Sequence, residues 1–204
     1  FQHQQSQDPI INKGIRIYEK ELYHMAQQIK KSKSPYGYIS MGSAIVCTIE
    51  SYIAVGGMST RNAAEDFYFM QSLAKHTKID TIKDILIYPS SRNEQRVHLG
   101  TGFRMSEYKK KQNFKNLFFS KSSYKIIKDL IKLVDKNYNQ PYANFNKDLN
   151  KDFNYNVCNF LRHHKLNNIW GKINNNAKSK KQFMTFFHQW FDALKIMQLL
   201  KTIN

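Results

Sequence analysis

The chain of 204 residues has few cysteines, few acidic side chains and no long apolar segment. Its two cysteines, Cys47 and Cys158, lie far apart and outside any Cys-x-x-Cys spacing, which argues against a disulfide framework and against a zinc site. The longest run rich in apolar residues, 44–58, contains Glu50 and a Gly-Gly pair and is too short to cross a bilayer. We therefore expect a protein that folds around its own core in a reducing compartment.

Acidic residues are scarce, and the resulting charge is unevenly distributed along the chain. The sequence has 15 Asp and Glu residues against 32 Lys and Arg residues, and the net charge is +3 over residues 1–102 and +14 over 103–204. This asymmetry predicts two units with different surroundings. A basic surface implies an anionic partner such as nucleic acid, a phosphorylated ligand or an anionic membrane leaflet, without choosing among them. An AT-rich genome would also produce many Lys and Asn residues.

Hydrophobic periodicity predicts most of the secondary structure. Apolar residues at steps of three and four predict helices over 12–31, 65–76 and 181–202. A shorter helix is expected over 50–55, ended by Gly56 and Gly57. The β-rich runs 42–47 and 85–88 predict two short strands, whereas 92–102 reads as a loop.

Two neighbouring carboxylates, Glu65 and Asp66, stand at the start of one of these helices. Acidic residues in a first turn are commonly structural, because they interact favourably with the helix dipole and with free backbone N–H groups. The alternative is chemical, because a carboxylate at a strand-to-helix junction can serve as the general base that takes a proton from an attacking hydroxyl. The pair alone leaves both interpretations open.

The surrounding sequence resembles a known family. The segment SPYGYISMGSAIVCTIESYIAVGGMSTRNAAEDFYFMQSLAK is similar to the acceptor-side half of bacterial family 2 glycosyltransferases, which have the GT-A fold. The downstream segment YPSSRNEQRVHLGTG resembles a pattern in one branch of these enzymes, close to YPSPRxSxRVPFGTG. The stretches INKGIRIYEKELYHM and FFHQWFDALKIMQLLK fit the same branch, so the resemblance covers most of 11–102 and returns in parts of the C-terminal helices.

This chain departs from the family pattern at several positions. Ala64 replaces the usual Gly before the Glu-Asp pair, Ser91 replaces a Pro, and His98-Leu99 replaces Pro-Phe. His98 places a titratable ring in a loop near the expected diphosphate.

The resemblance implies an α/β fold. Residues 1–104 would form the acceptor-side portion of a GT-A catalytic domain with a mixed sheet, and 105–204 a mainly helical, basic C-terminal lobe. It also implies inverting transfer of a sugar from a nucleotide-sugar donor to a saccharide or lipid-linked acceptor. Asp66 would be the general base and Glu65 its catalytic neighbour. The substrate-binding residues would be Arg92 and Arg96 at the leaving diphosphate, with Gly57, Gly100, Thr101 and Gly102.

One family motif is missing. Family members hold a divalent metal, Mg²⁺ or Mn²⁺, against the diphosphate with an Asp-x-Asp motif, and this chain has none. The resemblance therefore implies the C-terminal half of a longer enzyme, inactive by itself, whose metal ligands lie mostly outside this chain. Such an enzyme would be cytoplasmic and peripheral at the inner face of the plasma membrane.

Two other interpretations stay open. One is a basic nucleic-acid-binding module, favoured by the charge and by interleaved Lys and aromatic residues over 109–125, although no helix-turn-helix, RNP-like or zinc-finger signature is present. The other is a non-catalytic scaffold derived from a transferase. The histidines His163, His164 and His188 lack metal-ligand partners at suitable spacing and are interpreted as ordinary surface or interface residues.

Overall fold

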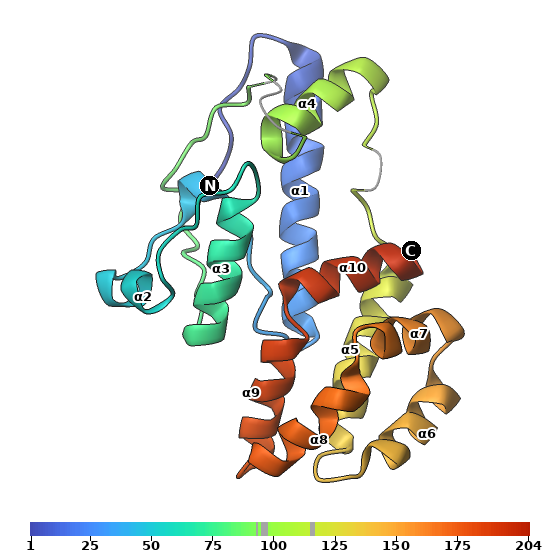
Figure 1. The fold of residues 1–204 in the computed structure, drawn as a ribbon. Coiled ribbons are helices and arrows are strands. Elements are labelled where there is room, and N and C mark those ends of the chain that lie inside the picture. Colours follow the sequence, from blue (N-terminus) through green and yellow to red (C-terminus); the bar gives the residue numbers. More distant parts are fainter. Residues whose placement is uncertain (93, 95–97, 115–116) are drawn as a thin grey trace. The chain divides into compact units, whose positions relative to one another are not determined.

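The computed structural model describes residues 1–92, 94, 98–114 and 117–204, and these residues form α-helices, one 3-10 helix and no strand (Figure 1). The elements are α1 (Pro9–Lys31), η1 (Gly42–Ala44), α2 (Ile49–Ala54), α3 (Glu65–His76), α4 (Gly100–Lys111), α5 (Lys121–Lys136), α6 (Tyr142–Asp152), α7 (Tyr155–His163), α8 (Leu166–Asn176), α9 (Lys180–Trp190) and α10 (Ala193–Ile203). They belong to two compact units. Unit 1 comprises residues 1–27 and 37–118, and unit 2 comprises 28–36 and 119–204.

In unit 1, α1 packs against α4. Gly14 allows the close approach, because a Cβ built at this position would lie 2.6 Å from the ring of Tyr108. The buried side chains of this contact come from α1, from α4 and from the segment after α4: Ile11, Ile15, Tyr18, Met105, Tyr108, Phe114 and Leu117. The long helix predicted over 12–31 is confirmed, and it begins three residues earlier, at Pro9.

A second, smaller core in unit 1 is built on α3. Its buried members are Phe69, Met70 and Leu73. Partly buried side chains from the preceding and following segments pack against them: Tyr38, Ile45, Val55 and Ile79. The predicted helices over 50–55 and 65–76 are confirmed as α2 and α3, and Gly56 and Gly57 follow α2 with positive φ angles of 77° and 71°.

The predicted mixed sheet is wrong, because the described residues contain no strand and the fold is helical rather than α/β. Residues 42–44 form the 3-10 turn η1, and 85–88 are extended without a sheet. The extended run has one neighbour: Gln2 donates its N–H to the Ile87 carbonyl at 3.1 Å, and Gln4 donates to that of Pro89 at 2.8 Å. An isolated two-stranded pairing of this kind is marginal in water.

Residues 100–102 also differ from expectation. The sequence predicts a loop over 92–102, but Gly100, Thr101 and Gly102 form the first turn of α4. Gly100 enters the helix with φ +80°. A Cβ at Gly102 would lie 2.2 Å from the Glu94 carbonyl oxygen, so glycine at 102 is what allows the backbone at Glu94 to pass close to α4.

Unit 2 contains the helices α5 to α10. Side chains just before four of these helices accept a hydrogen bond from the backbone N–H three residues later: Ser120, Asn154, Ser179 and Asp192. Each cap of this kind contributes about 1 kcal/mol to helix stability. The interior is aromatic, with the fully buried rings of Phe145, Trp170, Phe183, Phe187 and Phe191.

The single helix predicted over 181–202 is two helices, α9 and α10. The apolar stripe continues through both, but Phe191 leaves the helical conformation with φ −84° and ψ 68° while its ring stays buried. Asp192 then caps α10 by accepting the Lys195 N–H at 3.2 Å. An Asp at this position therefore starts a new helix within a continuous hydrophobic pattern.

Candidate functional site around Asp66

The start of α3 fixes both carboxylate oxygens of Asp66. Oδ1 accepts the backbone N–H of Phe67 at 2.7 Å, and Oδ2 accepts that of Gly42 at 3.1 Å. Gly42 opens η1, so this carboxylate joins the first turn of α3 to a segment 24 residues earlier in the chain. Each carboxylate oxygen has a second lone pair and can still accept a hydrogen bond from a ligand.

The surroundings of Asp66 raise the pKa of its carboxyl group. Burial is the largest cause, since Asp66 is partly buried, and the nearby charge of Glu65 acts in the same direction. The N–H groups of Phe67 and Gly42 oppose the shift, because they stabilise the ionised form. Glu65 itself is exposed. The two adjacent acids therefore lie in different environments, Asp66 partly buried and hydrogen-bonded and Glu65 exposed.

Residues of α1 and α4 lie near this carboxylate. The phenol of Tyr18 is buried, and burial raises its pKa. The charge of Asp66 raises this pKa further, whereas Arg104 and a hydrogen bond with the Thr101 side chain lower it. Thr101 was among the residues predicted from the sequence. Tyr18 and Arg104 were not, because one reads as a core position of a helix and the other lies outside every motif.

The remaining predicted residues are spread over unit 1. Arg92 is exposed, and among the described residues no hydrogen bond or ion pair joins it to Asp66 or Glu65. Arg96 lies outside the described residues. Gly57 follows α2, where a Cβ would lie 3.0 Å from the ring of Tyr52. These residues stay predictions, and Gly57 has a structural reason for being glycine.

A second cation missed by sequence reasoning lies beside the first turns of α3. The guanidinium of Arg61 stacks over the ring of Tyr68, with its central carbon 3.9 Å from the ring centroid. Arg61 is exposed, and it precedes Glu65 by four residues. Its only sequence signal is a basic residue between the Gly-Gly turn and the acidic pair.

The residue before α3 adopts a conformation that disfavours its side chain. Ala64 has φ 62° and ψ 24°, in the left-handed region where glycine is the usual residue. The sequence departure at this position, Ala where the family pattern has Gly, therefore falls at a strained backbone position.

Replacing Ala64 by Gly is expected to raise the free energy of unfolding of unit 1 by about 1 kcal/mol, because glycine adopts positive φ without steric conflict. Urea unfolding followed by circular dichroism measures the change. The control is Ala74→Gly in the same helix, which should lower stability by about 0.5–1 kcal/mol because glycine disfavours a helical position. Equal losses in the two variants would contradict the left-handed geometry of Ala64.

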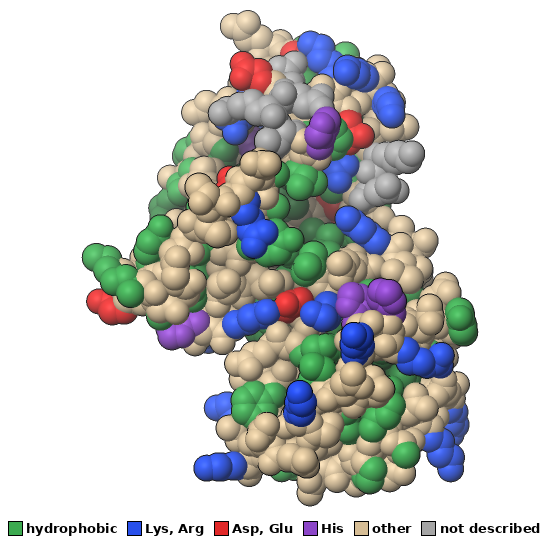
Figure 2. Space-filling model, in the orientation of Figure 1, with side chains coloured by type: hydrophobic (Ala, Val, Ile, Leu, Met, Phe, Trp, Pro, Cys, Tyr) green, Lys and Arg blue, Asp and Glu red, His purple; other side chains and the backbone are tan. Residues whose placement is uncertain are grey.

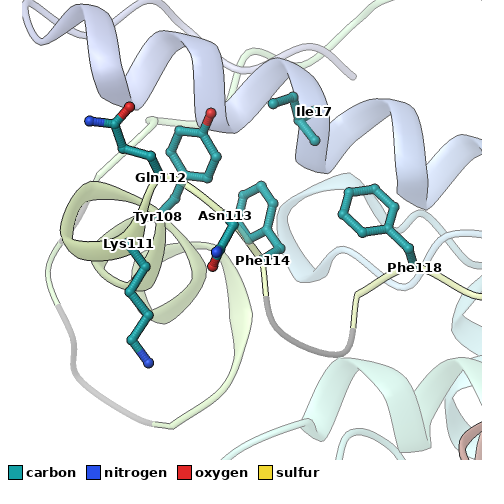
Figure 3. Close-up of a pocket in the computed structure, with 7 residues that line it drawn as sticks. All are labelled: Ile17, Tyr108, Lys111, Gln112, Asn113, Phe114 and Phe118. Atoms are coloured by element: carbon teal, nitrogen blue, oxygen red, sulfur yellow. The ribbon is translucent and has the colours of Figure 1, made fainter.

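An apolar pocket of about 670 Å³ opens between α1 and the end of α4 (Figure 3). Phe114 lines it and also packs against Tyr18, with ring centroids 6.2 Å apart. The figure shows the Lys111 side chain extending away from the aromatic rings. The lining residues are Ile17, Tyr108, Lys111, Gln112, Asn113, Phe114 and Phe118. Tyr18 thus contacts a pocket residue with its ring, while its phenol lies within electrostatic range of Asp66.

The carboxylates at the start of α3 have no further metal-ligating side chains beside them in the described part of the chain. Within residues 1–92, 94, 98–114 and 117–204, no three His, Cys, Asp or Glu side chains converge as ligands. Asp66 and Glu65 therefore do not form a metal centre by themselves.

Comparisons of the chain with protein-family models, with curated proteins and with solved structures give no match. The resemblance to family 2 glycosyltransferases is thus not supported by any family model, and the absence of strands from the described residues contradicts the GT-A sheet on which it depends. Among the described helices, none combines the length and the apolar character needed to cross a membrane.

Proposed function

We propose that this chain contributes the acceptor side of a sugar-transfer site, in which Asp66 is the general base. The observation that carries the proposal is the state of this carboxylate: both oxygens are positioned by backbone N–H groups, and burial raises its pKa. A fixed carboxylate with a raised pKa and free lone pairs suits the transfer of a proton from a hydroxyl group.

In the proposed reaction, the acceptor oxygen attacks the anomeric carbon of a nucleotide sugar as Asp66 takes its proton. The bond between the anomeric carbon and the diphosphate oxygen breaks, and its electron pair leaves with the diphosphate. Attack opposite the leaving group inverts the anomeric configuration. Asp66 then returns the proton to water. Exposed Glu65 would contact the acceptor, and Arg92 and Arg96 would face the departing diphosphate.

A divalent cation, Mg²⁺ or Mn²⁺, would neutralise the diphosphate in this reaction, with ligands outside the described residues. For the acceptor we propose a lipid-linked saccharide. The pocket beside Tyr18 supports this choice, because its aromatic and aliphatic lining suits the lipid portion of such a molecule. We also propose that the protein works in the cytoplasm at an anionic membrane surface, where a lipid-linked acceptor would lie.

Acceptor binding can be tested with the chain itself. Methyl glycosides of glucose, galactose, rhamnose and N-acetylglucosamine are titrated while the backbone amide signals of Gly42 and Phe67 are followed by NMR. These two N–H groups bond to the Asp66 carboxylate, so a sugar hydroxyl that engages it should shift both signals saturably.

The variant Asp66→Asn should weaken these shifts, because a neutral amide accepts a hydrogen bond from a hydroxyl group less strongly than a carboxylate does. The control Asp80→Asn, at an exposed Asp paired with Lys78, should keep them. The proposal fails if no glycoside shifts the signals, or if Asp66→Asn responds as the parent does.

A further inference from the structure

Helix α5 has two sharply different faces. Its buried side chains include Tyr124, Ile127, Leu130, Ile131 and Val134. Its five lysines are all exposed and follow one another at steps of four, three, four and four residues: Lys121, Lys125, Lys128, Lys132 and Lys136. With about 3.6 residues per turn, this spacing places all five within about 80° of arc. We call these five residues the lysine stripe, and it runs for about 22 Å at about 1.5 Å per residue.

The lysine stripe is poorly neutralised within unit 2. Lys132 lies 3.7 Å from Asp129, and Lys136 lies 3.6 Å from Asp148; both ion pairs are exposed. Across the part of the chain that the structure describes, Lys121, Lys125 and Lys128 form no ion pair. Like charges four residues apart on a helix destabilise it by about 0.2–0.5 kcal/mol per pair. Repulsion between neighbouring lysines therefore costs stability, which the two exposed ion pairs offset only in part.

The charge of the stripe agrees with that of its surroundings. Unit 2 has 18 Lys and Arg residues and 5 Asp and Glu residues, a net charge of +13. Unit 1 has 14 and 10, a net charge of +4. In Figure 2 the visible face of the helices α5 to α10 carries more Lys and Arg than acidic side chains. An anionic partner would meet little repulsion from unit 2.

The form of the stripe favours a lipid surface over nucleic acid. Five cations in a row along one helix, whose opposite face is core, can meet a flat anionic surface together. All five are Lys, and unit 2 has a single Arg, Arg162, although Arg is the residue suited to bidentate phosphate and base recognition. Tyr155 is the one exposed large aromatic side chain described in unit 2, and it lies on α7 rather than α5. Single-stranded nucleic acid is usually bound with aromatic stacking beside the cations.

We propose that the lysine stripe of α5 docks this protein on the anionic headgroups of a lipid bilayer. The contact is electrostatic, made by ammonium groups and lipid phosphates or carboxylates, without insertion of α5, whose apolar residues are buried in unit 2. The inference rests on the proposed membrane location and supplies the surface that makes the contact. It is independent of proton transfer at Asp66.

Vesicle sedimentation of the full chain tests the proposal. Binding is compared on vesicles of phosphatidylcholine alone and with 30% phosphatidylserine, at low and high salt. We expect binding that needs phosphatidylserine and weakens with salt. The triple variant Lys125→Gln, Lys128→Gln, Lys132→Gln should bind roughly a hundredfold more weakly, which corresponds to about 1 kcal/mol for each lysine.

The matched control removes three exposed lysines from other helices of unit 2, as Lys151→Gln, Lys172→Gln and Lys201→Gln, and should lose much less affinity. Far-ultraviolet circular dichroism shows whether both variants are folded. The salt dependence of vesicle binding by the parent protein tests the electrostatic contact without any substitution. Asp66→Asn should bind vesicles as the parent does, which separates this inference from the sugar-transfer proposal. Equal losses of vesicle affinity in both triple variants would show that the lysine stripe is not the docking surface. Binding to duplex or single-stranded DNA without affinity for anionic vesicles would show that the partner is not a lipid bilayer.

Discussion

Replacing Asp66 by Asn is expected to reduce sugar transfer by roughly a hundredfold or more, the range for loss of a general base. Asn has nearly the same shape, and its carbonyl oxygen can still accept one of the two backbone N–H groups that now bond to Asp66. It cannot take a proton from a hydroxyl group. The measurement is kcat for release of nucleoside diphosphate and glycosylated product.

The pH dependence of the same reaction gives an independent test. The base must be ionised, so kcat/KM should rise with pH through the pKa of Asp66, which burial places above its ordinary value of 3.8. Asp66→Asn should remove this rise of kcat/KM with pH. The control Asp80→Asn should keep both the rate and the rise of kcat/KM with pH, since Asp80 is exposed. A variant that loses stability but keeps its specific activity would show that Asp66 only stabilises the start of α3.

The largest pH effect on stability is expected from His188. This side chain is buried, burial lowers its pKa from 6.5 to about 4, and its Nδ1 has no hydrogen-bond partner among the described residues. The unfolded chain therefore binds a proton between pH 6.5 and 4 that folded unit 2 does not. Stability from this group is complete above pH 6.5 and falls by about 3 kcal/mol as the pH drops to 4.

Urea unfolding at several pH values measures this loss, and tryptophan fluorescence reports it, because Trp170 and Trp190 both lie in unit 2. The variant His188→Leu should lose most of the pH dependence in this window. The control His163→Leu, at an exposed histidine, should retain the parent's dependence. Parallel curves of unfolding free energy against pH for the parent and His188→Leu would refute the assignment. The sequence interpretation of His188 as a surface or interface residue did not anticipate its burial.

Local periodicity predicted the helices well but failed for the strands. In α1 and α3 the apolar positions repeat at helical spacing, and packing in unit 1 agrees with that pattern. The β-rich run 85–88 has strand-forming residues, but such propensity reflects packing on a half-buried sheet surface, which needs neighbouring strands. Leu86 is instead 66% exposed, and the backbone hydrogen bonds to this run that the described residues make come from the N-terminal segment. The residue types in this run could not show that it would lie without neighbouring strands among the described residues.

The candidate site was predictable in one part only. Asp66 could be singled out because it lies in a short motif of neighbouring residues, and such a motif can be recognised in a single sequence. Tyr18 and Arg104 join its surroundings through the packing of α1 against α4, two helices separated by about 70 residues of chain. Nothing local in the sequence specifies that packing. The break between α9 and α10 has a local signal, because Asp192 is a typical helix-capping residue. The apolar pattern that continues through both helices nevertheless predicted a single helix.

The two cysteines are free thiols, and each lies in a different unit, so their chemical modification reports on each unit separately. Cys47 is exposed in unit 1, whereas Cys158 is buried in unit 2, where burial raises the pKa of its thiol. Because the thiolate is the reactive form, an alkylating reagent should modify Cys47 rapidly in the native protein. Cys158 should react only when unit 2 opens. Its slow modification would therefore measure the opening free energy of the helices around α7.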